Sequence, residues 1–149
     1  MSSGFRIPHS RPWFAFADRG SQGCLLADIP AAMAMLRQRK LARRIMVIDL
    51  GALQANGLAA FLAGDENACL LDVYEKNNYP ATKQPEANGV AIEDGLSDGE
   101  YRGRVDGLLV KLLNEFQPDF VFYVAGVDVA AGDPVGKSAL TAAGILSRD

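Results

Sequence analysis

Three short runs of apolar residues constrain the fold of this chain more than any other feature. They read RIMVIDL, ACLLDVY and DFVFYVAGVD, and each is continuous and rich in β-branched or aromatic residues. Such runs are typical of strands that are buried on both faces, as in a parallel sheet, because strands with one wet face alternate apolar and polar residues. The sequence therefore predicts a sheet that is covered by helices on both sides.

Helical patterns fill the stretches between these strands. The expected helices cover residues 24–40, residues 56–64, a span from Ser97 or Asp98 to Phe116, and the closing segment LTAAGILSRD. In the first and third of them, apolar residues recur every three or four positions, which is the spacing of one helix face. GVAIED is expected to add a short edge strand. We predict an α/β fold with three layers, α/β/α, and a mostly parallel sheet.

The overall composition fits one globular domain. The chain has 149 residues, of which 49% are hydrophobic and 22% are charged, and its net charge is −3. Residues 1–23, rich in Ser, Gly, Pro and Arg, are expected to form an N-terminal arm, and residues 24–149 a single domain. The acidic balance argues against a nucleic-acid-binding protein, which normally has a basic surface.

Cysteine usage and the N-terminal segment indicate the compartment. Cys24 and Cys69 lie in apolar segments, so we expect buried, reduced thiols and a cytoplasmic protein. The N-terminal stretch has no uninterrupted apolar core of the kind found in signal peptides and membrane spans. We therefore expect neither export nor a transmembrane segment.

The carboxyl ends of the three strands are the candidates for a functional site, because parallel sheets bind ligands at these ends. Asp49 lies near the end of the first strand, Asp72 near the end of the second, and the third breaks at Gly126 into a turn that holds Asp128. No Gly-rich phosphate loop follows a strand, and the single histidine, His9, cannot form a catalytic triad.

Five blocks follow one another along the chain. They read VIDLGALQANG, LLDVYEKNNYP, SDGEYRGRVDGLL, PDFVFYVAGVDVAAGD and GILSRD. Together they resemble the histone deacetylase family, closest to its class IV branch, and DRGSQGCLLADI is similar to the segment after that family's paired histidines. The resemblance covers about residues 13–149. It implies the arginase/deacetylase fold in a shortened form, with an active site degenerate at several positions.

The resemblance assigns three positions to a catalytic zinc ion. Family members hold this ion with an Asp-X-His pair after one strand and with the Asp of an Ala-Gly-X-Asp turn after another. Asp128 occupies the last of these positions, whereas the first two read Gly51 and Leu53. Catalytic zinc needs about three protein ligands, so we expect Asp128 to be a vestigial ligand position without zinc.

The resemblance also places the family's proton-transfer groups. The paired histidines correspond to Trp13 and Phe14, and the family's tyrosine would follow Asp149. Imidazole is the side chain best suited to proton transfer near neutral pH. Its loss at both positions predicts a chain without catalysis and without a catalytic cofactor.

Two interpretations of the strand-end carboxylates stay open. The resemblance implies a structural K⁺ or Na⁺ site that is built from Asp49 and nearby backbone carbonyls, with Asp72 offering a second side-chain oxygen. From the residues alone, Asp49 can equally cap the turn that follows it. Asp128 can likewise bind a cation or accept hydrogen bonds from backbone N–H groups.

These residues predict a deacetylase-like pseudoenzyme that acts as a structural or interaction subunit of an assembly. The alternative is a zinc-dependent deacetylase for acetyl-lysine or a similar acetylated amine, either with unusual ligands or with a partner chain completing its site. A third hypothesis is a module that binds a small molecule or a cation in the pocket where the family has its active site. Because the family's domain is longer, the sheet is expected to lack neighbouring strands and the protein to bind a protein partner or a second copy. The arm residues Trp13, Phe14 and Phe16 are the expected contact, since aromatic side chains anchor interfaces.

Overall fold

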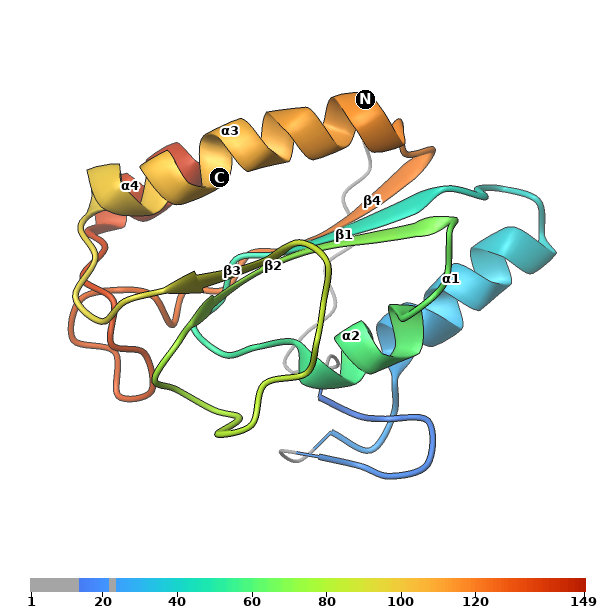
Figure 1. The fold of residues 1–149 in the computed structure, drawn as a ribbon, viewed down its shortest axis with the longest axis horizontal. Coiled ribbons are helices and arrows are strands. Elements are labelled where there is room, and N and C mark those ends of the chain that lie inside the picture. The colour runs from blue at the N-terminus through green and yellow to red at the C-terminus, as the bar shows by residue number, and fades with distance from the viewer. Residues whose placement is uncertain (1–13, 22–23) are drawn as a thin grey trace.

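A parallel sheet forms the middle of three layers (Figure 1). The computed structural model describes residues 14–21 and 24–149. In this part of the chain the strands are β1 (Ile45–Asp49), β2 (Ala68–Glu75), β3 (Gly89–Ile92) and β4 (Phe120–Val124). They pair in the order β3-β2-β1-β4, and every pair is parallel. The predicted α/β/α fold with a mostly parallel sheet is confirmed.

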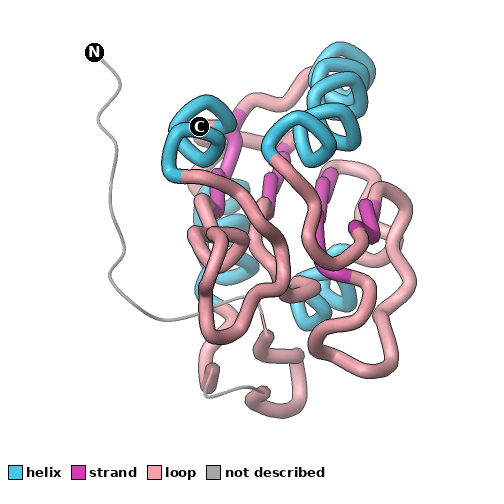
Figure 2. Tube along the Cα trace, turned by 90° about the vertical axis from the view of Figure 1, so that its left-hand side faces the viewer, coloured by secondary structure: helices cyan, strands magenta, loops and turns pink. Residues whose placement is uncertain are grey.

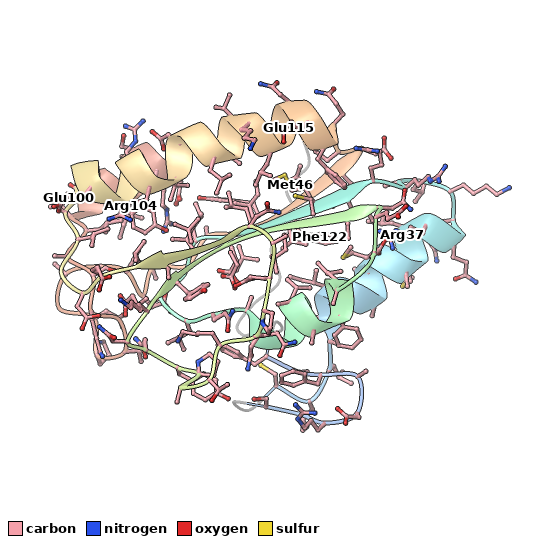
Figure 3. All side chains as sticks on the ribbon, viewed as in Figure 1. Arg37, Met46, Glu100, Arg104, Glu115 and Phe122 are labelled. Atoms are coloured by element: carbon pink, nitrogen blue, oxygen red, sulfur yellow. The ribbon has the colours of Figure 1, made fainter. Side chains whose placement is uncertain are left out.

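Two pairs of helices cover the two faces of the sheet (Figure 2). The helices are α1 (Asp28–Gln38), α2 (Asn56–Leu62), α3 (Asp98–Phe116) and α4 (Ala142–Arg148). Met46 lies on the side of the sheet that faces α3, and Phe122 lies on the opposite side (Figure 3). Because successive strand residues point to opposite faces, β1 contributes to both cores, with Met46 and Ile48 in one and Ile45 and Val47 in the other. None of the described helices is long and apolar enough to cross a membrane.

Helix α1 begins later than its sequence pattern predicted. The chain before it forms a tight bridge, in which the backbone N–H of Cys24 donates to the carbonyl of Ser21 at 2.8 Å and the reverse bond measures 3.0 Å. These bonds occupy backbone groups that a helix would need, so α1 starts only at Asp28. Leu25, which fits the apolar spacing, is 86% exposed. The prediction that the helix covers residues 24–40 is therefore wrong at its start.

Strand β4 is exposed, whereas its sequence predicted a strand buried on both faces. Phe120, Val121 and Tyr123 have exposed fractions of 40%, 39% and 44%, while every residue of β1 is buried. The reason is position, because β4 is at the edge of the sheet and β1 lies between two strands. An apolar run therefore predicted the strand correctly but not its place in the sheet.

Candidate functional site

The carboxyl ends of the strands bring the predicted carboxylates together. Asp49 and Asp72 are register partners on β1 and β2, and Asp128 lies in the turn after β4. Each accepts a hydrogen bond from a backbone N–H of the segment that follows β1. Asp49 Oδ1 accepts from Gly51 at 3.0 Å, Asp72 Oδ2 from Ala55 at 2.8 Å, and Asp128 Oδ1 from Ala52 at 3.1 Å. One oxygen of each carboxylate therefore accepts a backbone hydrogen bond, as the capping interpretation expects.

The second oxygens of Asp49 and Asp72 have a different environment. Both side chains have no exposed surface, and no described N–H or hydroxyl group donates to Asp49 Oδ2 or to Asp72 Oδ1. The Asp72 carboxyl lies within hydrogen-bonding distance of the Glu86 carboxyl, and these two acids can share a proton. Burial raises the pKa of Asp49 to about 8. Burial and the neighbouring Asp49 also raise the pKa of Asp72 well above its ordinary range. Two buried carboxyl oxygens without donors suit a hard cation, so these residues fit the monovalent cation that the resemblance implies.

Glu86 joins this group, although no sequence pattern pointed to it. It lies in the polar loop between β2 and β3, where its Oε1 accepts a hydrogen bond of 2.7 Å from Gln54 Nε2. Burial raises its pKa, and its charge helps to raise the pKa of Asp72. The long loop folds back over the strand ends because Gln54 also bonds the backbone of Gln84, at 2.8 Å and 2.7 Å. Only the tertiary fold brings Glu86 to this place.

Gly51 and Leu53 occupy two different surroundings. A Cβ atom at Gly51 would lie 3.2 Å from Asp49 Oδ1 and 3.4 Å from Asp128 Oδ1. Position 51 therefore lies beside Asp128, as expected for two positions that bind the same metal ion in the family. Leu53 points elsewhere, into a small apolar cluster with Phe14, Ala15 and Cys24, and it is only 6% exposed.

Phe14 is the centre of this apolar cluster. Its side chain has no exposed surface, and Tyr79 packs edge-on against its ring, with 5.8 Å between the ring centroids. The Tyr79 hydroxyl is 3.1 Å from Ser21 Oγ, which ties the same segment to the loop after β2. Phe14 therefore belongs to the chain's own core, and its predicted role as an exposed contact is wrong. Phe16 is partly buried under Arg19, and Trp13 lies outside the described residues.

Arg148 of α4 links the ends of two strands, and the sequence analysis did not predict this role. Its Nη1 donates to the carbonyls of Leu50 and Gly126, at 3.0 Å and 2.8 Å, and so joins the ends of β1 and β4. Tyr101 Oη donates to the same Leu50 carbonyl at 3.1 Å. The sequence showed Arg148 only as a charged residue near the end of a helix, where such residues are normally solvated.

The sequence profile of the histone deacetylase domain matches residues 14–149. The chain belongs to the histone deacetylase family. An uncharacterised protein of Picosynechococcus sp. is 36% identical over 135 residues, which are 91% of this chain and 45% of that protein. Histone deacetylase 2 of Arabidopsis thaliana is 35% identical over 136 residues, 89% of this chain and 35% of the relative. The chain thus spans less than half the length of these two relatives.

Solved structures show the same fold. A histone deacetylase homologue from Aquifex aeolicus superposes with a TM-score of 0.81 at 19% identity, over 91% of this chain and 40% of that one. An acetylpolyamine aminohydrolase from Burkholderia pseudomallei gives a TM-score of 0.77 at 23% identity, over 89% and 42% of the two chains. At these identities the superpositions support the fold alone.

The donor set of this deacetylase-family chain does not fit a catalytic zinc ion. Of the three ligand positions assigned by the resemblance, only Asp128 has a donor side chain, since Gly51 has none and Leu53 lies in the apolar cluster. Among residues 14–21 and 24–149, no three His, Cys, Asp or Glu side chains are arranged to share a metal ion.

Proposed function

We propose that this chain is a catalytically inactive member of the histone deacetylase family and that it acts as a structural or interaction subunit. One observation carries the proposal. Leu53, at a zinc-ligand position, packs in the same buried apolar cluster as Phe14, at a general-base position. Two positions that need polar side chains for catalysis thus share one core.

The cluster opposes catalysis. An imidazole at either position would be buried among apolar groups, and a buried polar group without a hydrogen-bond partner is unfavourable. Each general acid–base group contributes roughly 10²–10⁴-fold to catalysis, so one restored group would not bring back activity.

The second candidate is hydrolysis of an acetylated amine such as acetyl-lysine. Family membership favours it, because relatives carry the names deacetylase and acetylpolyamine aminohydrolase. This activity would need histidines from another polypeptide, since the only histidine of the sequence is His9.

A monovalent cation is the ligand that we assign to the strand-end carboxylates. Asp49 and Asp72 would hold K⁺ or Na⁺ through Asp49 Oδ2 and Asp72 Oδ1, and the ion would take the place of the proton that Asp72 and Glu86 can share. The cation would neutralise buried charge and would join β1 to β2. It would stabilise the fold and take no part in a reaction.

The test combines elemental analysis with an assay on an acetyl-lysine peptide and an acetylated polyamine. We expect well under one zinc per chain, bound potassium or sodium, and no hydrolysis of either substrate. The double variant Gly51→Asp, Leu53→His should take up more zinc, because position 51 lies beside Asp128, and should still not turn over. A matched control, Gly99→Asp with Leu26→His, adds the same groups at exposed positions and should not change zinc uptake.

Stoichiometric zinc with hydrolysis in the unmodified protein would overturn the proposal. Equal zinc uptake by the two double variants would show that position 51 and position 53 do not correspond to ligand positions. Activity that follows the protein through successive purification steps would favour the second candidate.

A further inference from the structure

Basic residues gather where helix α1 meets strand β1, at the end of the sheet opposite the strand-end carboxylates. Five of the chain's 15 Lys and Arg residues lie within this short stretch, although the net charge of the chain is −3. They are Arg37, Arg39, Lys40, Arg43 and Arg44. The acidic residues of the adjoining loops are Asp65, Glu66 and Asp119. Positive charge is therefore in excess at this end of the sheet, where Figure 3 shows Arg37 beside α1.

An open pocket of about 680 Å³ lies among these residues. Lys40, Arg43 and Asp119 line it on the polar side. Leu41, which is 68% exposed, and Ala42 give it an apolar side. Pockets for small molecules measure about 300–1,000 Å³, so this volume exceeds what a bare inorganic ion needs. The pocket suits an anionic group that is carried by an organic molecule.

The end of α1 does not itself require these cations. Basic side chains near the C-terminus of a helix often bond its last carbonyl groups. Here the carbonyls of residues 35–37 already accept backbone N–H groups of residues 39–41, at 2.9–3.0 Å. Arg43 lies beyond the helix, next to the start of β1. Another role is therefore needed for Lys40 and Arg43.

The backbone of Lys40 lies in the left-handed region, with φ at 58°. The position just after a helix is usually glycine in this conformation, because a Cβ atom is strained there. Gln117 has a similar φ after α3, but its amide donates to the carbonyls of Leu113 and Asn114, at 3.3 Å and 3.0 Å. Lys40 Nζ has no such acceptor among the described residues. Its ammonium group is available to a ligand.

The fold holds Arg43 in place without using its terminal donors. Its Nε donates to Asn67 Oδ1 at 3.1 Å, and its backbone N–H donates to Asp119 Oδ2 at 2.9 Å. Its carbonyl accepts from Arg37 Nε at 3.1 Å. Neither Nη1 nor Nη2 has an acceptor in the described part of the chain. Two such donors in one plane fit two oxygens of a phosphate or carboxylate group.

We propose that this pocket binds a phosphate monoester. Arg43 donates its two Nη groups to two phosphate oxygens, and Lys40 supplies a second positive charge. A dianion balances these two cations, whereas a carboxylate balances only one. The organic part of the ester lies against Leu41 and Ala42. The ester belongs either to a small molecule or to a phosphoserine of a partner protein, and both present the same group.

The proposal goes beyond the function proposed above and does not depend on it. The pocket lies at the starts of the strands, and the carboxylates Asp49 and Asp72 lie at their ends. Its test measures binding of a phosphate ester and involves neither zinc nor hydrolysis of an acetylated amine. An active deacetylase could bind the ester, and an inactive subunit could fail to bind it.

The first experiment is isothermal titration calorimetry with glycerol 3-phosphate, using glycerol and acetate as control ligands. We expect the phosphate ester to bind and neither control to bind comparably. Arg43→Gln should weaken binding by about tenfold or more, because it removes two hydrogen bonds to a charged group. The matched control Arg104→Gln makes the same change on α3, at the other end of the molecule in Figure 3, and should bind like the wild type.

Lys40→Gly separates a binding role from a structural one. We expect severalfold weaker binding of glycerol 3-phosphate, because the ammonium group is lost. The unfolding temperature should stay the same or rise, since glycine removes the strain at a positive φ. A variant with unchanged affinity would show that Lys40 does not contact the ligand and would contradict the proposal.

The tripeptide Gly-phosphoserine-Gly and its unphosphorylated form distinguish the two sources of the ester. If the phosphorylated peptide binds more tightly than glycerol 3-phosphate, the site takes a partner protein, and if it binds more weakly, the site takes a small molecule. Either result supports a phosphate monoester site. Failure of both phosphates to bind, equal binding of acetate, or equal affinities of Arg43→Gln and Arg104→Gln would each overturn the proposal.

Discussion

At the scale of single residues, Phe14 and Leu53 join two segments of the chain in one apolar cluster. Both positions are polar in the family to which the sequence blocks point, and here both are buried and apolar. The strand-end carboxylates have a structural role. Asp49, Asp72 and Asp128 each accept a hydrogen bond from a backbone N–H of the segment that follows β1. The edge thus keeps the groups that shape its turn and has apolar side chains at positions 14 and 53.

If Leu53 is a core residue, its truncation should be costly. We expect Leu53→Ala to lower the free energy of unfolding by about 2–4 kcal/mol, the range for a buried leucine. Leu26→Ala, at a site that is 78% exposed, is the matched control and should have little effect. Urea denaturation of both variants gives the comparison. Equal stabilities would show that the apolar cluster contributes nothing to folding.

The sequence predicted the positions of these residues better than their contacts. The blocks around Gly51, Leu53 and Asp128 placed all three at strand ends, and the structure agrees. The contact between Leu53 and Phe14 could not be predicted, because no local pattern says which loops meet. Glu86 was missed for the same reason, since it comes from a polar loop that looks like any solvated loop.

At the scale of elements, local signals determined most of the boundaries. Helix α3 begins at Asp98 and is capped by Ser97, one of the two capping residues that the sequence offered, and the backbone N–H of Ser97 donates to the carboxylate of Glu100 at 2.9 Å. Helix α1 and strand β4 departed from their predictions through non-local causes. A bridge between Ser21 and Cys24 delays α1, and the order of the strands leaves β4 at an edge. Neither the bridge nor the strand order can be predicted from the spacing of apolar residues.

The starts of α3 and α4 are held together by one carboxylate. Asp98 accepts hydrogen bonds from Thr141 N at 2.8 Å and from Thr141 Oγ1 at 2.7 Å. A Cβ atom at Gly144 would lie 1.9 Å from Asp98 Oδ1. The two helices can therefore pack in this way only if position 144 has no side chain.

This packing makes two Gly→Ala changes differ in sign. We expect Gly144→Ala to lower the free energy of unfolding by about 1–3 kcal/mol, because Asp98 must give up its bonds to Thr141. Gly103→Ala on α3 meets no atom within 4 Å and should raise stability by about 0.5–1 kcal/mol, since alanine favours helices. Thermal unfolding of the two variants measures both effects. Destabilisation by both would contradict the role given to Gly144.

At the scale of the whole molecule, burial falls from the centre of the sheet towards β4. Every residue of β1 is buried, β2 is buried from Cys69 to Glu75, and no residue of β4 is fully buried. The chain nevertheless forms two apolar cores, one on each face of the sheet. This distribution predicts a stable centre and a weak edge in a single copy of the chain.

Hydrogen exchange should reveal this gradient. We expect the amides of β1 and β2 to exchange slowest and those of β4 fastest among the strands, because exchange follows local burial and opening. Slow exchange of the β4 amides would mean that the outer edge of this strand is covered, and would contradict the gradient.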